Sequence, residues 1–482
     1  MRRIGSRIVA VRPCRAQFWK SSSSGATVPR ILAGLLMFLA FQLWLASGVE
    51  AKNQELQYAF PGAEGYGRTA QGGRGGAILE VTNLEDAGPG SLRACVDAKG
   101  PRNCIFRVSG VIHLKSTLLV REEASFLSIL GQTAPGGGIV LTIEEPNAKK
   151  WNTPLIVKNA HDVVIRHLKI RPQLPNSVKN VDALTVENSA RVYVDHVSGA
   201  WATDENINAH SDTTDLTIAN SIFAEGLNKH SKCTLLGSDP HMPQNITFLK
   251  NLCLSNRDRN PDNNHYGKSC IEIINNVFFN AKSEWGEVFS QFPGGTPISY
   301  VGNYFKAGPS TEDTTYAIHS KETDKAENPQ IYQAGNVSWA PKSKSIVMIA
   351  PETEPYIVST PPCPLSVDKI LSAPAAYEEI RTHAGAFPRD RLDSDWITDM
   401  GPEGQGGRGR MVNKSGGLPP VEQGTAYVDD DHDGIADSIE AELGAKVGIN
   451  DAWSMKEEGE WSHFDEFMQW LSEERIVGRY PR

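Results

Sequence analysis

The chain has 482 residues, of which 40% are hydrophobic and 22% are charged, and its formal net charge is −9. This composition excludes a disordered or fibrous protein and leaves room for one large domain with an accessory part. The part from Lys52 onward holds 41 basic and 56 acidic side chains, a net charge of −15. Because binding to nucleic-acid phosphates needs clustered Lys and Arg, this acidic part argues against a nucleic-acid partner.

The first 51 residues have the pattern of a secretory signal peptide. Seven basic and no acidic residues precede position 50, and an apolar run without charges extends from Ile31 to Ala46. The small residues Val49 and Ala51 then fit a cleavage site, so we expect residues 1–51 to be removed on export. The alternative is an uncleaved membrane anchor, although the apolar run is shorter than the roughly 20 residues that span a bilayer. In either case the remainder works outside the cytoplasm, and the chain meets a membrane only if the leader is retained.

The cysteines also indicate an oxidising compartment. Of the seven, Cys14 lies in the leader, which leaves an even number in the mature chain. Cys95 and Cys104 flank a turn-like sequence, and we expect them to form a disulfide. The pairing of Cys233, Cys253 and Cys270 stays open. Neither a Cys-x-x-Cys motif nor a Cys/His zinc spacing is present in the sequence.

A short phrase recurs through the middle of the chain, between about residues 160 and 340. Each copy has strand composition and ends in Asn or His, and successive end positions are 24 to 33 residues apart. A β-sandwich with hairpins, the alternative, has turns every 8–12 residues, whereas stacked coils allow variable loops. We therefore expect an all-β fold, a parallel β-helix. The copies are Val163–His167, Val192–His196, Leu216–Asn220, Ile246–Asn251, Ile273–Asn276, Ile298–Asn303 and Ile331–Asn336.

A set of motifs extends over about residues 58 to 345. They are Ala59–Gly67 (AFPGAEGYG), Gly72–Gly76 (GGRGG), Gly88–Arg93 (GPGSLR), Gly131–Gly136 (GQTAPG), Tyr193–His196 (YVDH), Trp201–Glu205 (WATDE) and Arg259–Pro261 (RNP). Together these motifs resemble the pectate lyase family, polysaccharide lyase family one, in its bacterial secreted branch. The resemblance implies a right-handed parallel β-helix over residues 52–400. It also implies a calcium-dependent enzyme that cleaves α-1,4-galacturonan by β-elimination and leaves unsaturated oligogalacturonides.

The resemblance places the calcium ligands on Asp182, Asp204 and Asn208. The family carries Asp at the third position, so this chain offers a neutral carbonyl there, and Glu205 is a candidate to compensate for the missing charge. Calcium suits this reaction because it takes six to eight oxygen ligands and can bridge protein and sugar carboxylates. The alternative interpretation is that these acids only occupy exposed turns. Asp195 and His196 are interpreted as structural residues of a neighbouring coil.

The same resemblance places the catalytic base on Arg259 and a supporting lysine on Lys232. Arginine is normally a poor base because its guanidinium stays protonated in proteins. The base role is therefore implied by the family and not by general chemistry, and a surface arginine is the alternative. Five residues after the base the family often has a second Arg for the substrate carboxylate, whereas this chain has Asn264. Substitutes for it would be Arg257, Arg171 and Lys229.

The C-terminal part contains a linker and a second candidate calcium site. Residues 401–424 are rich in Gly and Pro and are interpreted as a linker, followed by a tail over 425–482. Positions 1, 3, 5, 9 and 12 of an EF-hand loop match acids here, with Gly434 at position 6 and the carbonyl of Ile435 at position 7. An exiting helix is expected over 437–443 without an entering helix, and an amphipathic helix over 462–475. The acids are Asp429, Asp431, Asp433, Asp437 and Glu440.

Three functions remain open at this point. The first is the exported pectate lyase acting on acidic plant cell-wall polysaccharide, with Ca²⁺ as its cofactor, and we expect a monomer. The second is a non-catalytic β-helix that binds such polysaccharide, which Asn208 and Asn264 keep open. The third is a hydrolase, which needs paired carboxylates at glycosidase separation. Asp204 and Glu205 are adjacent, and on a strand they would face opposite sides, which disfavours the hydrolase.

Overall fold

The computed structural model describes residues 57–147, 151–227, 230–283, 285–321, 327–457 and 461–479. All of them belong to one compact unit, Leu56–Arg482. The expected signal peptide over 1–51 and Cys14 lie outside these residues. None of the helices in the described part of the chain has the length and apolar character needed to cross a membrane.

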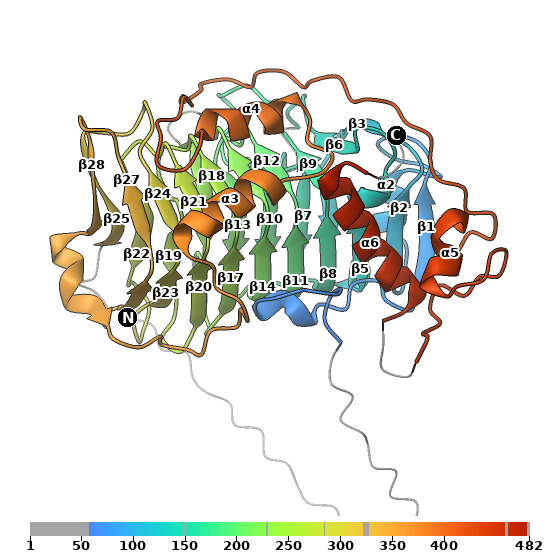
Figure 1. Cartoon of the computed structure of the whole chain (residues 1–482), viewed down its shortest axis with the longest axis horizontal. Coiled ribbons are helices and arrows are strands. Elements are labelled where there is room, and N and C mark those ends of the chain that lie inside the picture. The colour runs from blue at the N-terminus through green and yellow to red at the C-terminus, as the bar shows by residue number, and fades with distance from the viewer. Residues whose placement is uncertain are drawn as a thin grey trace, which may run out of the picture. The chain divides into compact units, whose positions relative to one another are not determined.

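The described strands form three parallel sheets that wind around one axis, as Figure 1 shows. The first, sheet A, has eleven strands: β1 (Ala77–Val81), β2 (Arg102–Phe106), β5 (Leu127–Leu130), β8 (His161–Arg166), β11 (Ala190–Asp195), β14 (Thr214–Ala219), β17 (Asn245–Leu249), β20 (Cys270–Ile274), β23 (Pro297–Val301), β26 (Gln330–Ala334) and β29 (Ile357–Val358).

The other two sheets have nine strands each among the described residues. Sheet B contains β3 (Gly110–His113), β6 (Ile139–Thr142), β9 (Leu168–Ile170), β12 (Ser198–Ala200), β15 (Ile222–Ala224), β18 (Leu252–Leu254), β21 (Val277–Phe279), β24 (Tyr304–Lys306) and β27 (Val337–Trp339). Sheet C contains β4 (Leu118–Val120), β7 (Leu155–Lys158), β10 (Leu184–Glu187), β13 (Glu205–His210), β16 (Lys232–Leu236), β19 (Asp262–Asn264), β22 (Gly286–Phe289), β25 (Thr314–Lys321) and β28 (Ser345–Ile349).

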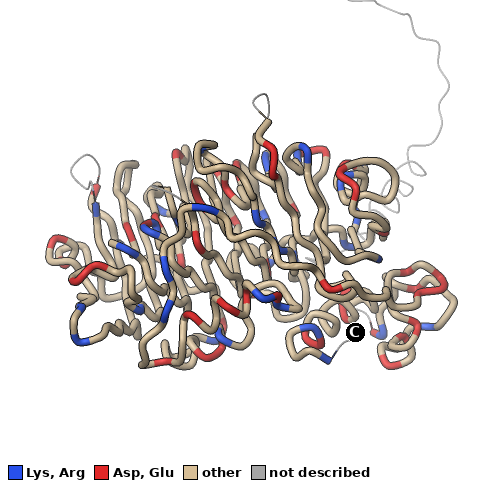
Figure 2. Tube along the Cα trace, turned by 90° about the horizontal axis from the view of Figure 1, so that it is seen from above, with Lys and Arg blue, Asp and Glu red and all other residues tan. Residues whose placement is uncertain are grey.

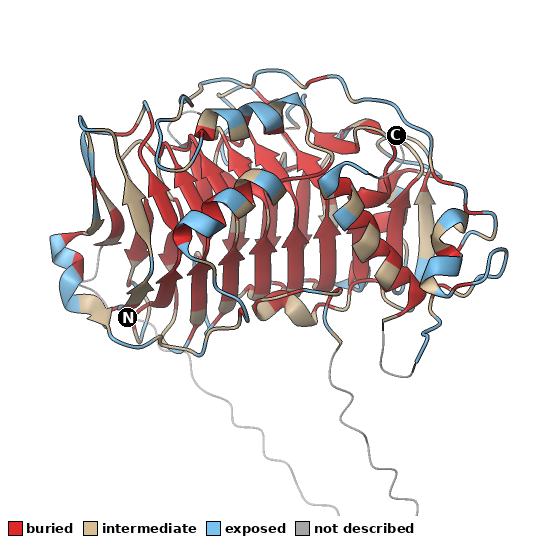
Figure 3. Cartoon of the chain, viewed as in Figure 1, coloured by how far each residue is buried: buried red, intermediate tan, exposed pale blue. Residues whose placement is uncertain are grey.

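Each complete coil of the solenoid contributes one strand to each sheet in the order C, A, B. The coil β7–β8–β9, for example, is followed by β10–β11–β12, and β8 pairs in parallel with β11. Inward-facing Val, Ile, Leu and Phe side chains of successive coils stack into one continuous buried core, which a single coil could not form alone. Figure 3 shows this buried interior along the solenoid. The expectation of an all-β parallel β-helix is confirmed.

The recurring phrase coincides with sheet A. Its seven copies fall on seven consecutive strands, β8 through β26, so the spacing of 24 to 33 residues is the length of one coil. The Asn residues that end the later copies form a buried ladder at the corner between sheets A and B. The backbone N–H of Asn251 donates to Oδ1 of Asn276 (2.8 Å), and that of Asn276 donates to Oδ1 of Asn303 (2.9 Å). The ladder satisfies main-chain groups where the strands stop pairing.

Helices cover two faces of the solenoid. The helices α3 (Ala373–His383) and α4 (Arg391–Met400) pack on outward apolar residues of sheet B, whereas α6 (His463–Val477) packs beside the first coils of sheet A. The expected helices over 437–443 and 462–475 are confirmed as α5 and α6. The remaining helical segments are α2 (Leu92–Val96), α5 (Asp437–Leu443) and the 3₁₀ turns η1 (Tyr66–Thr69), η2 (Glu122–Ala124), η3 (Gly131–Thr133) and η5 (Pro351–Tyr356).

Three disulfides connect the six cysteines of the described residues. The expected pair Cys95–Cys104 is confirmed. Cys233 pairs with Cys253 and Cys270 pairs with Cys363, which answers the pairing that the spacing left open. Acidic and basic residues are interspersed along the length of the solenoid, as Figure 2 shows.

Candidate functional site

The candidate site residues lie on four consecutive coils, where the chain turns from sheet B into sheet C. Asp182 precedes β10, and Asp204 and Glu205 stand at the start of β13. Lys232 begins β16. The parallel register pairs Glu205 with Lys232, and Lys232 with Asp258 of the next coil. Residues far apart in the sequence therefore become neighbours because each occupies the same position in its coil.

Three carboxyl groups converge at this corner. Asp182, Asp204 and Glu205 each offer an oxygen, and these oxygens lie within 4.8 Å of one another. Asp182 is held by the hydroxyl of Thr185, which donates to Oδ2 (2.5 Å), and by the backbone N–H of Glu205, which donates to Oδ1 (3.1 Å). The three acids form one acidic cluster on adjacent coils.

Asn208 lies beside this acidic cluster and supplies one more oxygen. Its Nδ2 donates to Oδ2 of Asp182 (3.2 Å), while its Oδ1 is buried and has no hydrogen-bond partner. A buried amide oxygen without a partner costs free energy, which a cation would offset. Carboxylate and amide oxygens are the donors that calcium prefers, so the residues present fit that ion.

The environment of the cluster disfavours charge on Asp182 and Glu205. Burial raises the pKa of Asp182 to about 6, and the negative charge of Asp204 adds to the effect. Burial also raises the pKa of Glu205, together with the charges of Asp182 and Asp204, while Arg259 partly opposes the increase. Buried carboxylates this close together are stabilised when a cation neutralises them.

Arg259 faces the same acidic cluster from the following coil. Its Nη1 lies 2.5 Å from Oε1 of Glu205, and its Nε lies 3.1 Å from Oδ2 of Asp262. Its backbone N–H donates to Oε2 of Glu287 (2.8 Å), which fixes the main chain at a residue with a left-handed φ of 52°. Burial alone lowers the pKa of Arg259, but the charges of Glu205 and Asp262 outweigh it and raise the pKa.

Lys232 completes the group of charges. Its Nζ lies 3.8 Å from Oδ1 of Asp204 and 3.8 Å from Oε1 of Glu205. Lys232 and Arg259 therefore both face the same oxygen of Glu205. The structure brings together five residues that the sequence pointed to, namely Asp182, Asp204, Asn208, Lys232 and Arg259.

A cavity of about 210 Å³ opens beside Arg259 on the outer side of sheet C. Asn264 lines it, and its Nδ2 donates to Oε1 of Gln291 (2.9 Å). The lining is formed by Leu235, Gly237, Ser238, Asp239, Arg259, Asp262, Asn264, Phe289 and Gln291. The cavity is polar, and Arg259 is the basic side chain among these residues.

One of the suggested substitutes for the second arginine is wrong. Arg171 is fully buried and its guanidinium pairs with Asp390 (2.5 Å) and Asp393 (2.8 Å) of the segment that begins α4. These two carboxylates neutralise its charge away from the cavity, so Arg171 does not serve a substrate there. Lys229 lies outside the described residues.

The sequence argument about Asp204 and Glu205 also needs a correction. It assumed that both residues lie on a strand and face opposite sides, but β13 starts at Glu205, so Asp204 belongs to the preceding turn. The turn lets both carboxyls face Asp182. Glu205 and Asp262 are the site residues that sequence reasoning underrated. The register of Glu205 against Lys232 would have revealed Glu205, if the strand boundaries had been known.

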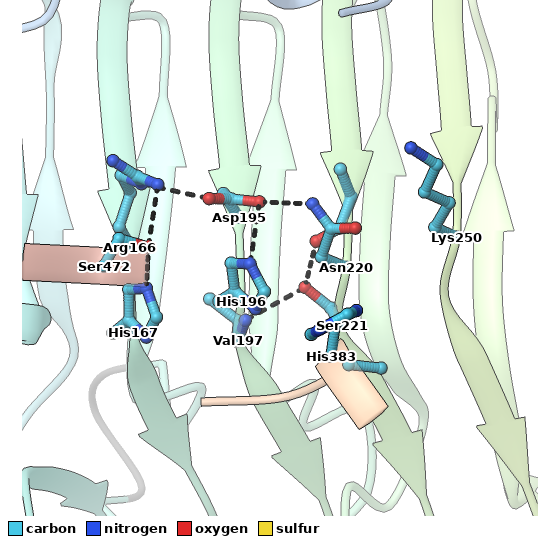
Figure 4. A network of polar contacts seen from close by, with 12 residues as sticks. Arg166, His167, Asp195, His196, Val197, Asn220, Ser221, Lys250, His383 and Ser472 are labelled. Atoms are coloured by element: carbon cyan, nitrogen blue, oxygen red, sulfur yellow. Dashed lines mark hydrogen bonds and ion pairs between the residues drawn. The ribbon is translucent and has the colours of Figure 1, made fainter. Parts of the chain in front are cut away.

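Asp195 and His196 have the structural role that was expected for them. Both are buried, Oδ2 of Asp195 accepts from Nε of Arg166 (3.0 Å), and His196 stacks on His167 with 4.7 Å between ring centroids. Figure 4 shows these contacts running across adjacent coils. The pair lies at the end of β11 in sheet A, apart from the acidic cluster at sheet C.

The acids that the sequence suggested as a second calcium site lie close together in the C-terminal tail. Oxygens of Asp429, Asp431 and Asp433 lie within 4.8 Å of one another. Asp437 is turned to the main chain, where its Oδ1 accepts from the N–H of Asp430 (3.1 Å). Glu440 lies on the first turn of α5 and is buried.

The fold and the site together define a parallel β-helix protein with an acidic cluster, an arginine and a lysine at one corner of sheet C. Comparison with known proteins gives the family. A family model described as pectate lyase matches residues 62–387. The chain belongs to the pectate lyase family, and it is a polysaccharide lyase.

The curated relatives agree over most of the chain. It is 32% identical to a protein named probable pectate lyase C of Aspergillus flavus over 411 residues, which cover 83% of this chain and 91% of the relative. It is also 32% identical, with the same coverage, to the protein of that name from Aspergillus fumigatus. Both relatives are fungal and give no support to the bacterial branch.

Among solved structures, the cedar pollen allergen jun a 1 matches with a TM-score of 0.49 and 19% identity, covering 67% of this chain and 92% of the allergen.

Proposed function

We propose that the chain is a secreted, calcium-dependent pectate lyase that cleaves α-1,4-galacturonan by β-elimination and releases unsaturated oligogalacturonides. The observation that carries the proposal is the convergence of Asp182, Asp204 and Glu205 with Arg259 and Lys232 at one corner of the solenoid. Acidic plant cell-wall polysaccharide is the substrate class, because the family acts on it and the cavity beside Arg259 is open and polar.

In this proposal Asp182, Asp204, Glu205 and Asn208 hold the calcium ion through their oxygens. Bound there, calcium would withdraw electron density from the uronate carboxylate and so acidify the proton at C5. The unpartnered Oδ1 of Asn208 supports its role as a ligand. Its neutral amide in place of a carboxylate predicts a weaker calcium site than one formed by three acids.

Arg259 is assigned the removal of the C5 proton of the substrate. Lys232 is assigned a supporting role, in which its positive charge acts on the guanidinium of Arg259. In the ion pair with Glu205 the guanidinium keeps its proton, since the neighbouring carboxylates raise its pKa. Arg259 can accept a proton only under two conditions. These carboxylates must no longer pair with its guanidinium, and the positive charge of Lys232 must disfavour the protonated form of Arg259. The base role therefore requires Glu205 to be neutralised first, which links the two halves of the site.

Export is also part of the proposal. Three disulfides in the described residues support it, because such bonds persist in oxidising compartments. The leader pattern of residues 1–51 is the sequence feature that agrees with it.

The test is the ultraviolet absorbance of polygalacturonate mixed with the purified chain, once with calcium and once with a chelator. Elimination creates an unsaturated uronate that absorbs in the ultraviolet, whereas hydrolysis does not. A rise in absorbance that the chelator abolishes is the expected result. A chain that binds the polymer but produces neither absorbance nor new reducing ends would instead be a non-catalytic polysaccharide-binding protein. New reducing ends without absorbance would identify a hydrolase.

A further inference from the structure

The C-terminal loop 429–440, here called the acidic loop, crowds carboxyl groups into one small space. It connects the linker to α5, and oxygens of Asp429, Asp431 and Asp433 lie within 4.8 Å of one another. Backbone N–H groups of the loop bind some of these oxygens: the N–H of Asp433 donates to Oδ1 of Asp429 (3.1 Å), and that of Gly434 donates to its Oδ2 (3.1 Å). These bonds fix the conformation of the loop, but they do not reach all of its carboxylate oxygens.

Glu440 is the observation that points to a ligand. Its side chain is 0% exposed, and neither of its carboxylate oxygens has a hydrogen-bond partner. Asp433 is also 0% exposed with an unpartnered Oδ2, and Oδ2 of Asp431 is buried without a partner. An ionised carboxylate buried without a hydrogen bond or counter-ion costs several kcal/mol, so natural structures pair such groups.

The side chain of Glu440 lies near other carboxylates. Those that act on it are Asp431, Asp433 and Asp437 of the acidic loop and Asp451 beyond it. Four carboxylates are therefore close enough to act on the fifth.

Protein cations do not neutralise this group. Among the described residues, Arg107 is the basic side chain within 4.0 Å of these acids, and its Nη1 reaches only Oδ2 of Asp429 (3.9 Å). The guanidinium of Arg107 lies against the ring of Tyr427, 4.5 Å from its centroid, and also pairs with Glu80 (3.5 Å). It leaves Asp433 and Glu440 without a counter-ion.

We propose that the acidic loop binds one calcium ion through carboxylates of Asp429, Asp431, Asp433 and Glu440 and the main-chain carbonyl of Ile435, and that this ion holds the C-terminal tail on the first coils of sheet A. The ligands are oxygens alone, and they occupy positions 1, 3, 5, 7 and 12 of a calcium loop, with Gly434 at position 6. Calcium fits this set better than zinc, which takes nitrogen and sulfur ligands.

The acidic loop is placed to transmit binding to the solenoid. Ile435 is fully buried and belongs to one apolar cluster with Ile105 of β2, Leu130 of β5 and Phe464 of α6. A Cβ atom at Gly434 would lie 2.9 Å from the ring of Phe464 and 3.0 Å from Ile78 of β1. Gly434 and Ile435, which lie between Asp433 and Glu440, are thus the residues of the loop that contact the solenoid and α6.

Asp451 connects the acidic loop to α6. The next residue, Ala452, is buried in the same apolar cluster as Ile435, and Oδ1 of Asp451 lies 3.3 Å from Nδ1 of His463, the first residue of α6. Further along α6, the hydroxyl of Ser472 contacts Nε2 of His167 (2.7 Å) and Nη2 of Arg166 (3.1 Å) on β8 and the turn after it, as Figure 4 shows. Ordering the acidic loop therefore orders the start of the helix that reaches these residues.

This site is separate from the proposed catalytic calcium site, which lies at sheet C, and the proposal does not depend on lyase activity. The test counts calcium bound per full-length chain by equilibrium dialysis and measures trypsin cleavage after Lys446 and Lys456. The variant is Asp433→Asn/Glu440→Gln. Glu442→Gln is the matched control, because Glu442 is an exposed acid on the same helix. Asp182→Asn reports on the catalytic site alone.

We expect Asp433→Asn/Glu440→Gln to bind one calcium fewer than the wild type and to keep lyase turnover, which also shows that it folds. In the wild type and in Asp182→Asn, calcium at 100 times its Kd should slow tail cleavage about 100-fold relative to chelator. The Asp433→Asn/Glu440→Gln variant should lose this protection, and Mg²⁺ alone should not supply it.

An unchanged calcium count in the Asp433→Asn/Glu440→Gln variant would overturn the site. Equal tail cleavage of the wild type with calcium and with chelator would overturn the holding role, and this measurement needs no variant. If Asp433→Asn/Glu440→Gln does not fold, the single variant Asp433→Asn is measured in its place. Failure of the catalytic site would instead appear as a calcium count unchanged by Asp182→Asn.

Discussion

Nη1 of Arg259 lies 2.5 Å from Oε1 of Glu205, so the candidate base and a candidate calcium ligand form an ion pair. The pair explains how an arginine can be kept inactive and in place. As long as Glu205 faces it, the guanidinium stays charged, and Lys232 competes for the same oxygen at 3.8 Å. The residue proposed to bind the metal and the residue proposed to move the proton are therefore in direct contact.

The first prediction concerns Arg259→Lys. The change keeps a positive charge at the site but removes the guanidinium that spans Glu205 and Asp262. We expect turnover on polygalacturonate to fall by about 10²–10⁴, the usual contribution of a general base. The measurement is initial elimination rate at saturating calcium, with Arg121→Lys, a change at an exposed residue of another loop, as control. Wild-type turnover in Arg259→Lys would remove the base assignment.

The second prediction concerns Asn208→Asp. An added carboxylate beside Asp182 and Asp204 should bind calcium more strongly, so that half-saturation occurs at about tenfold lower calcium. Without metal the same change should lower thermal stability, because it replaces the Nδ2 hydrogen bond to Asp182 with a like charge. The calcium-induced rise in Tm should therefore increase relative to the wild type.

The matched control for this prediction is Asn264→Asp. It adds the same charge on sheet C, but Asn264 bonds to Gln291 beside the cavity and does not face the acidic cluster. A calcium response that is the same in Asn208→Asp and Asn264→Asp would show that Asn208 is not a ligand.

Much of the solenoid could be predicted, because its sheet A strands carry the recurring phrase. At the corner after β20, two neighbouring Asn residues have different roles. Asn275 takes the left-handed backbone (φ 55°), and Asn276 forms the ladder. Gly302 (φ 64°) and Asn303 repeat the division one coil later. Sheet B could not be read in the same way, since most of its strands have only three residues and no periodicity.

Only those residues of the candidate site that belong to family motifs could be predicted from the sequence. Asp182 and Asp204 were found through the resemblance, but the role of Glu205 depends on where β13 begins, and strand boundaries are not encoded in a local pattern. The docking of the tail could not be foreseen at all. It depends on pairs such as Arg74 and Asp465, which are 391 residues apart and lie 3.1 Å from each other. Such contacts follow from packing and leave no signal in the local sequence.

The third prediction concerns Asn276→Ala in the ladder. The side chain is fully buried, its Oδ1 accepts from the N–H of Asn251, and its Nδ2 donates to the carbonyl of Phe248 (2.8 Å). Truncation leaves both groups without a partner, at about 1–3 kcal/mol each. We expect the free energy of unfolding in urea to fall by about 3 kcal/mol, whereas Asn413→Ala, at an exposed residue, should change it by less than about 0.5 kcal/mol. Equal effects of the two changes would contradict the ladder's contribution.

The fourth prediction concerns acid stability and His265. This residue is fully buried, and its Nδ1 lies 2.6 Å from Oε1 of Gln244. Because Nε2 of Gln244 donates to the carbonyls of Ser211 and Thr213, its Oε1 is the acceptor and Nδ1 of His265 carries the proton. Burial lowers the pKa of His265 to about 3.

Because the pKa of His265 is lower in the folded chain than in the unfolded chain, acid destabilises the fold. Between pH 6.5 and 3 the unfolded chain binds a proton at this histidine that the folded chain does not, so stability falls as pH decreases through this window. One such group costs about 1.4 kcal/mol for each pH unit below 6.5. His265→Asn should remove this part of the slope when unfolding free energies are measured in chelator from pH 6.5 to 4.5. His113→Asn, at an exposed histidine, should keep the wild-type slope. A His265→Asn slope equal to that of the wild type would mean that burial does not keep His265 neutral.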